Sequence, residues 1–509
     1  MKKIIYLLLV AILFSCGDLE EMNLNPDSPT KVTPDFLATN IILNSTRRIT
    51  GKWLLDDTWL MKSTAFTEHM EWYMYNKFGR NEPNNKGEFR HMPDLINAQK
   101  MIEMAEADES LPEGEKKAYL ALNHFMRAYF FYGLTMELGD IPCSEALKGE
   151  SEGIFSPKYD TQEMVFSIII KDIQEAARLF GEATILNGDF VYNGDVARWQ
   201  RASNSFALSV LNMLSEKQNV GDINVKTKFE EIAKRPLIDS EENSYRREYS
   251  STKTSQWYPF YFEHQNFWSY PVFTSFFIDI LKDLEDRRLF YYAEPAAKLS
   301  NIAVDSFDAY SGVNPIMEYG KIQAEFTEGL HSSLNKRYYR VPEGEPVKFV
   351  AYSETHFVLA EAALRGWATP LSAKEHYENG VRSTMLFTAK HTPEEYKHNV
   401  IIDEAYINSY LNNEAKFDSS KGLEQIILQK YIGSFVQVPF NSYYDYRRTG
   451  LPKLPINPET NMNEVKTQLP LRFMYPSSEY SQNRENVEEA VQRQFGGSDT
   501  PNDVMWLLK

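Results

Sequence analysis

The clearest hydrophobic pattern in the chain lies between residues 116 and 138, KKAYLALNHFMRAYFFYGLTMEL. Apolar side chains recur there at intervals of four and three positions, at Ala118, Leu122, Phe125, Tyr129, Tyr132 and Met136. These intervals place them on one face of an α-helix. Gly139 and Pro142 follow directly and are typical helix terminators. The pattern predicts a helix over residues 116–138 with one buried face.

Two further segments have the same period. Asp160-Thr-Gln-Glu163 is a capping-box pattern, and it precedes an apolar stripe that runs from Val165 to Phe180. A second stripe begins after Asp195 and continues to Met213. Four weaker patterns also favour helices, over residues 35–50, 56–78, 94–107 and 351–367. Helices therefore dominate the first 220 residues.

The predicted fold class is mainly α, with helices packed in pairs. Small residues stand where such helices could approach closely, at Ala121, Ala128, Ala176, Ala360 and Ala363. No tetratricopeptide consensus with a period of about 34 residues is present, so a helical-repeat scaffold is an interpretation of the pattern alone. The period fades over residues 221–348, where aromatics, Gly and Pro recur. That stretch predicts an irregular, loop-rich insertion with a few short strands, and loops often hold binding sites.

The N-terminus has the pattern of a lipoprotein leader. Lys2 and Lys3 precede an apolar run over residues 4–14, which is too short to span a bilayer. The run ends in Leu13-Phe14-Ser15-Cys16, which resembles the bacterial lipobox, where the cysteine is acylated and becomes the first residue. We expect a signal peptide over residues 1–15, a lipidated tether over 16–33, and one domain over 34–509. Two acyl chains anchor a protein firmly to a membrane.

Asp18, Glu20 and Glu21 follow the cysteine and are open to two interpretations. They resemble the surface-export signal of lipoproteins in the Bacteroidota, and they would equally suit a solvated acidic linker. Without residues 1–15 the chain keeps 52 basic and 71 acidic residues, a net charge of −19. This excess of negative charge argues against nucleic acid as a partner.

Cysteine usage leaves the folded chain without a disulfide. Once Cys16 carries lipid, Cys143 is the remaining cysteine, and a single thiol forms no intramolecular disulfide. The fold must therefore rest on a hydrophobic core, which a chain of this length builds readily. We interpret Cys143 as an ordinary small residue, because no histidine is placed to activate it.

Several motifs along the chain together resemble the SusD/RagB family of nutrient-binding outer-membrane lipoproteins, in its SusD-like branch. They are Asn25-Pro26, RAYFFYGLTMELGDIPCSEAL from Arg127, YDTQEMVFSIIIKDI from Tyr159, GDVARWQRASNSFAL from Gly194, YSETHFVLAEAALRGW from Tyr352, LQKYIGSF, YDYRRTGLP from Tyr444, LPLRFMYPSSEYSQNREN and the closing GGSDTPNDVMW. Each motif is weak alone. Their order and spacing behind a lipobox carry the resemblance.

The resemblance implies a scaffold of about eight main helices in tetratricopeptide-like pairs, here over residues 34–220 and 350–440. Members of this family are lids on TonB-dependent transporters of the SusC type in the outer membrane, and they capture glycans or peptides without catalysis or a cofactor. This chain departs from its branch at Tyr443, where Trp is common, and at Asp286-Arg287-Arg288, where Asp-Pro-Arg is common. We interpret both places as packing.

Aromatic residues make up 14% of the chain and concentrate in two segments. A flat ring suits the C–H face of a sugar, while amides and charged groups bind its hydroxyls. In the first segment, residues 53–78, Trp59, Phe66 and Tyr73 recur every seven positions and are expected in the core. Three rings lie partly off that stripe and are candidate ligand contacts: Trp72, Tyr75 and Phe78.

The second aromatic segment, QWYPFYFEHQNFWSY over residues 256–270, has no helical period. Pro259 and Pro271 interrupt it, and polar residues such as Gln256, Glu263 and His264 alternate with its rings. Rings that face a ligand are more common in such a loop. The candidate ligand-binding residues here are Trp257, Tyr258, Tyr261, Trp268 and Tyr270. Mixed rings and amides favour a glycan, whereas the negative charge would also suit a neutral or basic peptide.

Metal and enzyme chemistry have weaker support. The nine histidines show no ligand spacing, and Glu68, His69 and Glu71 are expected on a solvated surface. Residues 186–195, LNGDFVYNGD, could form a calcium loop but more simply predict paired turns. A lipid-anchored glycoside hydrolase with a carboxylate pair is the alternative function. We interpret Asp445-Tyr-Arg-Arg448 as an ion-paired structural corner.

Overall fold

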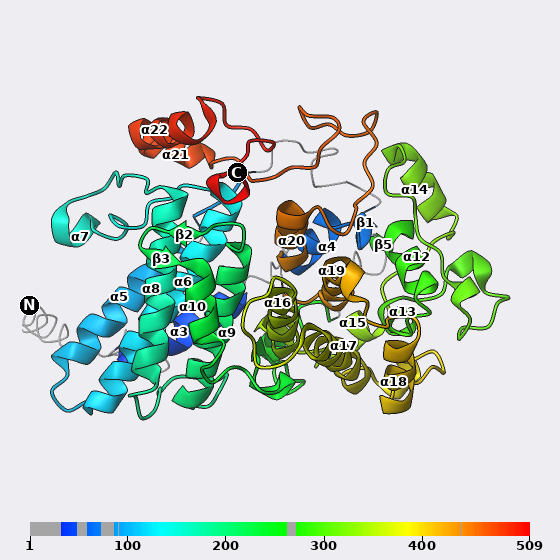
Figure 1. Cartoon of the computed structure of the whole chain (residues 1–509), viewed down its shortest axis with the longest axis horizontal. Helices are drawn as coiled ribbons and strands as arrows, with labels where there is room; N and C mark the ends of the chain where they lie inside the picture. Colours follow the sequence, from blue (N-terminus) through cyan, green and yellow to red (C-terminus); the bar gives the residue numbers. More distant parts are fainter. Residues whose placement is uncertain (1–31, 48–58, 73–85, 90, 262–270, 439) are drawn as a thin grey trace, which may run out of the picture.

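The computed structural model describes residues 32–47, 59–72, 86–89, 91–261, 271–438 and 440–509. Helices form most of it, and strands occur as short pairs, so the predicted mainly α fold class is confirmed. Figure 1 shows two groups of helices side by side, with the first half of the chain in one group and the second half in the other. The first group consists of α3 (Pro34–Arg47), α5 (Met92–Ala107), α6 (Glu113–Leu138), α7 (Gly149–Glu152), α8 (Gln162–Phe180), α9 (Val196–Met213) and α10 (Val225–Ile232).

The second group continues from the middle of the chain to its end. Its helices are α12 (Ser275–Asp283), α13 (Arg288–Tyr292), α14 (Tyr319–Thr327), α15 (Arg337–Arg340), α16 (Tyr352–Leu364), α17 (Ala373–Lys390), α18 (Glu404–Asn412), α19 (Gly422–Gly433) and α20 (Asn441–Thr449). The short helix α4 (Trp59–Phe66) packs on α20. Finally, α21 (Ser477–Gln482) and α22 (Arg484–Phe495) lie beside the C-terminus at one end of the first group (Figure 1).

The long helices pack mainly on their sequence neighbours: α3 on α5, α5 on α6, α6 on α8, α8 on α9, and α16 on α17. Four of the six residues predicted to form the inner face of α6 are fully buried: Ala118, Leu122, Phe125 and Met136. The other two, Tyr129 and Tyr132, are partly buried and pack against the core. Contacts of α9 with α16 join the two groups. One contiguous hydrophobic core runs through both groups of helices.

The start of α8 differs from its prediction by one residue. Thr161, and not Asp160, is the N-cap, and its side chain accepts a hydrogen bond from the backbone N–H of Met164. Asp160 instead accepts backbone N–H donors from Cys143 and Ser144, at 3.0 and 2.7 Å. The carboxylate therefore holds the loop that precedes the helix. Asp195 caps α9 as predicted.

The described residues form three two-stranded antiparallel sheets, two of which connect distant parts of the chain. β1 (Met70–Trp72) pairs with β5 (Pro271–Phe273), with Met70 opposite Phe273 and Trp72 opposite Pro271. β2 (Asn219–Val220) pairs with β3 (Ile223–Asn224), and β4 (Tyr245–Arg247) pairs with β6 (Val347–Val350). The predicted helix over residues 56–78 is thus wrong over residues 67–72, because the chain turns at Glu68, whose φ of 60° ends the helical path.

The irregular middle of the chain contains more helix than the sequence indicated. Among the described residues between 221 and 348 lie helices α10 and α12 to α15, each with fewer than ten residues. The period of such a short helix covers too few turns to be recognised against a background of loops. Among the described residues, no helix has the length and hydrophobicity needed to cross a membrane.

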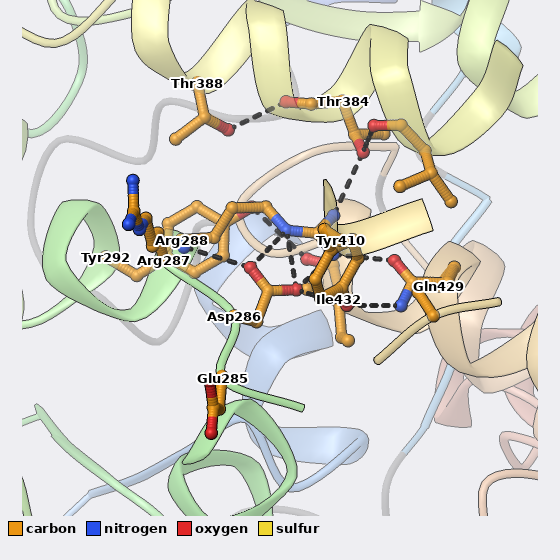
Figure 2. A network of polar contacts seen from close by, with 12 residues as sticks. Glu285, Asp286, Arg287, Arg288, Tyr292, Thr384, Thr388, Tyr410, Gln429 and Ile432 are labelled. Atoms are coloured by element: carbon orange, nitrogen blue, oxygen red, sulfur yellow. Dashed lines mark hydrogen bonds and ion pairs between the residues drawn. The ribbon is translucent and has the colours of Figure 1, made fainter. Parts of the chain in front are cut away.

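A buried polar network holds the second group together, as Figure 2 shows. The Arg288 guanidinium donates to Asp286, to Thr384 Oγ1 at 3.0 Å and to Gln429 Oε1 at 2.7 Å. Tyr410 donates to the same Asp286 carboxylate at 2.9 Å. Arg288 thereby ties α13 to α17 and α19, and the interpretation of this unusual Asp286-Arg287-Arg288 motif as packing is confirmed.

Candidate functional site

The pairing of β1 with β5 joins the first aromatic segment to the strand that follows the second. β1 lies within residues 53–78, and β5 begins directly after residues 256–270. The two strands lie about 200 residues apart in the chain, so the periodicity of the sequence gave no sign of their pairing. Trp72 stands opposite Pro271 in this sheet. We call this sheet, together with the loop after β4 that includes Trp257 and Tyr261, the aromatic face.

Four of the predicted ligand contacts lie outside the described residues. They are Tyr75, Phe78, Trp268 and Tyr270. Cys16, the predicted lipidation site, also lies outside them. The second aromatic segment is described up to Tyr261, in the loop after β4, and this part includes Trp257, Tyr258 and Tyr261.

Trp257 and Tyr261 form a pair of rings on this loop. Both are partly exposed, and their ring centroids lie 4.9 Å apart at an interplanar angle of 87°. Trp257 donates its indole N–H to the Ser251 carbonyl at 3.4 Å. Lys253 and Gln256 are exposed beside the rings. A paired ring platform with flanking amide and ammonium donors suits a sugar or another flat polar ligand.

Tyr258 corrects the prediction that its ring faces a ligand, because its side chain is 1% exposed. The ring packs perpendicular to Tyr249 at 5.2 Å and to Phe260 at 5.1 Å. Burial raises the pKa of the Tyr258 hydroxyl far above its ordinary value. Tyr258 therefore anchors the loop from beneath, while its neighbour Trp257 reaches the surface.

The loop is clamped to the segment that leads into β6. The backbone N–H of Tyr258 donates to the Pro342 carbonyl at 2.7 Å. Gly344 lies against the Tyr258 ring, and a Cβ at this position would stand 2.2 Å from a ring carbon. Its φ of 49° also lies in the region that favours glycine. Gly344 is needed here for its missing side chain and for its backbone conformation.

A second buried arginine fixes that clamp. Arg337 is 2% exposed, and its guanidinium donates to Glu345 at 2.7 Å and to the Tyr291 carbonyl at 2.9 Å. Gln437 donates to the other oxygen of Glu345 at 2.8 Å. A charge-assisted network of this kind holds its members in one geometry. Nothing in the local sequence around Arg337 indicated that it supports the aromatic loop.

Glu68, His69 and Glu71 contradict the expectation of a solvated surface, since each is at most 3% exposed. His69 stacks on Tyr431 at 4.0 Å and donates from Nε2 to the Tyr431 carbonyl at 3.0 Å. Its Nδ1 accepts from Thr67 at 2.8 Å. Burial lowers the pKa of His69 to about 3. This neutral histidine supports the β1 end of the aromatic face from inside.

The loop over residues 186–195 consists of turns, as the simpler interpretation predicted. The Asp189 carboxylate accepts backbone N–H donors from Val191, Tyr192 and Gly194. It also accepts the Trp199 indole N–H at 2.9 Å. A carboxylate surrounded by donors has little capacity left for a cation. Within the described part of the chain, no group of three or more candidate ligands could hold a metal ion.

The Asp445-Arg448 motif is an ion-paired corner, which confirms its interpretation. Arg448 pairs with Glu361 and, at 3.0 Å, with Asp445. Lys430 lies between Glu354 at 2.6 Å and Asp445 at 2.8 Å. Burial alone would raise the pKa of Glu361, but Arg448 outweighs it and lowers that pKa to about 2. These carboxylates are bound by cations of the protein itself, so they join helices α16, α19 and α20.

Buried Cys143 also agrees with its structural interpretation. Its side chain is 3% exposed, and burial raises the pKa of the thiol well above its ordinary value. A thiol that keeps its proton is a poor nucleophile. Cys143 is therefore a core residue.

Known proteins similar to this chain share its fold over nearly its whole length. A family model, SusD-like_2, described as "Starch-binding associating with outer membrane", matches residues 26–476. No curated protein matches the chain.

Three solved structures resemble it closely. A SusD homologue from Bacteroides fragilis has 36% sequence identity and a TM-score of 0.86, and a second from the same organism has 31% and 0.80. A candidate nutrient-binding outer membrane protein from Bacteroides vulgatus has 30% identity and a TM-score of 0.82. Each alignment covers 94% of this chain and 100% of the other.

Proposed function

The chain belongs to the SusD-like family, whose members bind starch and associate with the outer membrane, and we propose that it captures oligosaccharides at the cell surface as the lid of a SusC-type TonB-dependent transporter. The observation that carries the proposal is the pair of partly exposed rings, Trp257 and Tyr261, whose centroids lie 4.9 Å apart on the loop after β4. Rings gathered in this way provide a platform for the C–H faces of sugars.

The first part of the proposal is that Cys16 anchors the chain to the membrane. In this proposal, Cys16 carries the acyl chains, residues 16–33 form the tether, and residues 34–509 stand outside the membrane as one domain. Helix α3 begins at Pro34, directly after the proposed tether. Replacement of Cys16 by Ala should leave ligand binding intact and abolish membrane anchoring. A Cys16→Ala chain that still fractionates with the outer membrane through a lipid would contradict this.

The proposed association with a transporter is tested by co-purification. A tagged chain extracted in mild detergent should bring down a TonB-dependent transporter, with the helical scaffold docked on it and the aromatic face toward the enclosed ligand. The tag should bring down the transporter equally well from cells grown with and without a glycan. Recovery of the chain alone under both conditions would count against the lid.

The ligand assigned by the proposal is tested by calorimetry with a panel of neutral oligosaccharides and short peptides. We expect oligosaccharides to bind and to be recovered unchanged. Shortened products after incubation would instead support the lipid-anchored hydrolase, and binding of peptides alone would move the proposal to peptide uptake. A transporter gene beside this one, with glycosidase genes nearby, would support the glycan assignment before any purification.

A further inference from the structure

A separate groove lies between the two groups of helices, with a volume of about 670 Å³. Its walls come from α9, from the segment after α10, from the first turns of α16 and from the loop after that helix. Residues central to the argument are Arg201, Lys234, Asp239, Tyr352 and His356. None of the lining residues belongs to the predicted aromatic segments. The volume is within the range of small-ligand sites, about 300–1,000 Å³.

A chain of hydrogen bonds fixes the proton positions of two histidines beside this groove. The backbone N–H of Leu371 donates to His376 Nε2 at 3.3 Å, so that nitrogen has no proton. His376 must then carry its proton on Nδ1, which lies 2.9 Å from Nδ1 of His356. His356 accepts this hydrogen bond and keeps its own proton on Nε2. His356 is partly exposed, and it lines the groove.

The consequence is a fixed, uncharged donor at the groove. The Nε2–H of His356 has no acceptor among the described residues, so it is available to a ligand oxygen. Burial lowers the pKa of His356 to about 4. Burial, and to a smaller extent the repulsion that a protonated His356 would exert, lowers the pKa of His376 to about 4 as well. Both rings therefore stay neutral at the pH of most aqueous environments, and the polarity of this hydrogen-bond chain persists.

The aromatic part of the groove is Tyr352. Its ring is partly exposed and stands perpendicular to that of His356, with centroids 4.5 Å apart. Its backbone N–H donates to Ser244 Oγ at 3.0 Å, which fixes the start of α16 against the residue before β4. A ring beside a fixed N–H donor can cover the C–H face of a sugar while the donor binds a hydroxyl or ring oxygen.

The charge of the groove is opposite to that of the whole chain. Arg201, Lys234 and Arg235 line it together with one acidic residue, Asp239. Arg201 pairs with Asp239 at 3.1 Å, and Arg235 pairs with Glu231 outside the groove. Lys234 is exposed and pairs with no acidic residue in the described part of the chain. A protein with a net charge of −17 therefore has an uncompensated ammonium group at this position.

From this combination we propose that the groove is a second ligand site, which binds an oligosaccharide that carries carboxylate groups. Tyr352 covers a sugar ring, the Nε2–H of His356 donates to a hydroxyl or ring oxygen, and Lys234 binds the sugar carboxylate. The site does not depend on the aromatic face, because it shares no residue with it. It would add selectivity for acidic glycans to whatever the aromatic face binds.

The test is a calorimetric titration of the mature chain with tetragalacturonic acid at pH 7 and low salt. We expect binding that weakens with added salt, because an exposed ion pair is screened. Lys234→Glu should weaken it at least tenfold, while Lys234→Arg should retain it. Lys298→Glu is the matched control: it changes the net charge equally at another exposed lysine and should have no effect.

Four outcomes would overturn the proposal. They are no binding of the tetramer, equal affinity in Lys234→Glu, equal affinity for tetraglutamate, and equal weakening by Trp257→Ala. The third would assign the groove to acidic peptides, and the fourth would place the tetramer on the aromatic face. Maltotetraose, a neutral sugar, tests the lid function independently of this proposal. If the aromatic face holds it, it should bind the Lys234→Glu variant and the unmodified chain alike.

Discussion

The two sides of α16 use polar residues in opposite ways. Glu354 and Glu361 lie two helical turns apart on one side, where Lys430, Arg448 and Arg365 neutralise them inside the protein. Tyr352 and His356 lie one turn apart on another side and line a groove. The first side is closed, with each charge bound by another charge of the protein. The second keeps donors and a ring available to solvent.

The two sides of α16 show what determines whether a polar residue serves packing or ligand binding. Residue types alone do not, since a carboxylate-rich helix would suit catalysis as well as packing. The position around the helix decides, because α16 advances about 100° per residue and so separates Tyr352 from Glu354 by more than half a turn. Polar groups on the inner side must find partners within the fold. Those on the outer side need none and can bind a ligand.

The largest expected effect comes from breaking the closed side. Arg448→Ala leaves Glu361 and Asp445 buried with one cation fewer, and we expect a loss of about 3–5 kcal/mol in the free energy of unfolding. Urea denaturation followed by circular dichroism measures it. Arg448→Lys, which keeps the charge but not the two-pronged geometry, should recover part of the loss. A change below 1 kcal/mol in Arg448→Ala would show that the ion cluster does not hold these helices together.

The second prediction concerns the pH dependence of the same side. The folded pKa of Glu361 is about 2, below the ordinary value of 4.5, so its ionisation stabilises the fold above pH 4.5. This contribution, about 3 kcal/mol by linkage, is lost as the pH falls through 2. Stability curves between pH 2 and 6 should therefore be flatter for Glu361→Gln than for the unmodified chain. Parallel curves would contradict the assignment.

The third prediction separates the aromatic face from the fold. Trp257→Ala combined with Trp268→Ala should weaken neutral oligosaccharide binding at least thirtyfold, which corresponds to about 2 kcal/mol. The thermal transition should stay unchanged, because Trp257 packs on the partly exposed Tyr261 and not on the core. Tyr258→Ala is the matched contrast, since it removes a ring that is 1% exposed and should lower the transition temperature. Unchanged affinity with an intact fold would refute this assignment of the rings.

The fourth prediction tests the open side of α16. Tyr352→Ala should weaken tetragalacturonate about tenfold, or about 1.4 kcal/mol, with little change in stability because the ring is partly exposed. Tyr352→Phe keeps the ring and should bind nearly as well as the unmodified chain. Equal weakening in both variants would mean that the hydroxyl, and not the ring face, makes the contact.

The smallest effect is expected at an exposed ion pair. Arg484 and Glu488 lie on the surface of α22 at 2.7 Å, with side chains 72% and 51% exposed. Arg484→Ala should change the free energy of unfolding by less than about 0.5 kcal/mol, because solvent and salt screen such pairs. This variant sets the baseline for Arg448→Ala in the same denaturation assay.

The helical part of the fold was predictable because its signals are local. Repeated intervals of three and four, an Asp cap and a terminal Gly place α6 and α9 to within a few residues. The same signals mislead over residues 67–72, where a helical period continues in the sequence after the chain has turned. The turn at Glu68 depends on partners far along the chain, such as Thr274, whose hydroxyl donates to the Glu68 carbonyl.

The site was less predictable for the same reason. The sequence indicates an irregular aromatic segment here but does not distinguish Trp257 from its neighbour Tyr258, since the difference comes from Gly344 and Pro342 beneath that loop. The groove at Tyr352 was missed altogether. Its residues come from four separate segments. The sequence signal there is an aromatic residue followed four positions later by histidine, and this pattern is too common to mark a binding site. Sequence periodicity and local motifs do not reveal contacts between distant segments.

The pairing of β1 with β5 has a consequence for the order of assembly. Joining Met70–Trp72 to Pro271–Phe273 closes a loop of about 200 residues, and such distant contacts form slowly and late. The helix pairs on either side are local and should be complete earlier. We therefore expect the β1–β5 sheet to form after the helix pairs and its backbone amides to exchange with deuterium before those of α6.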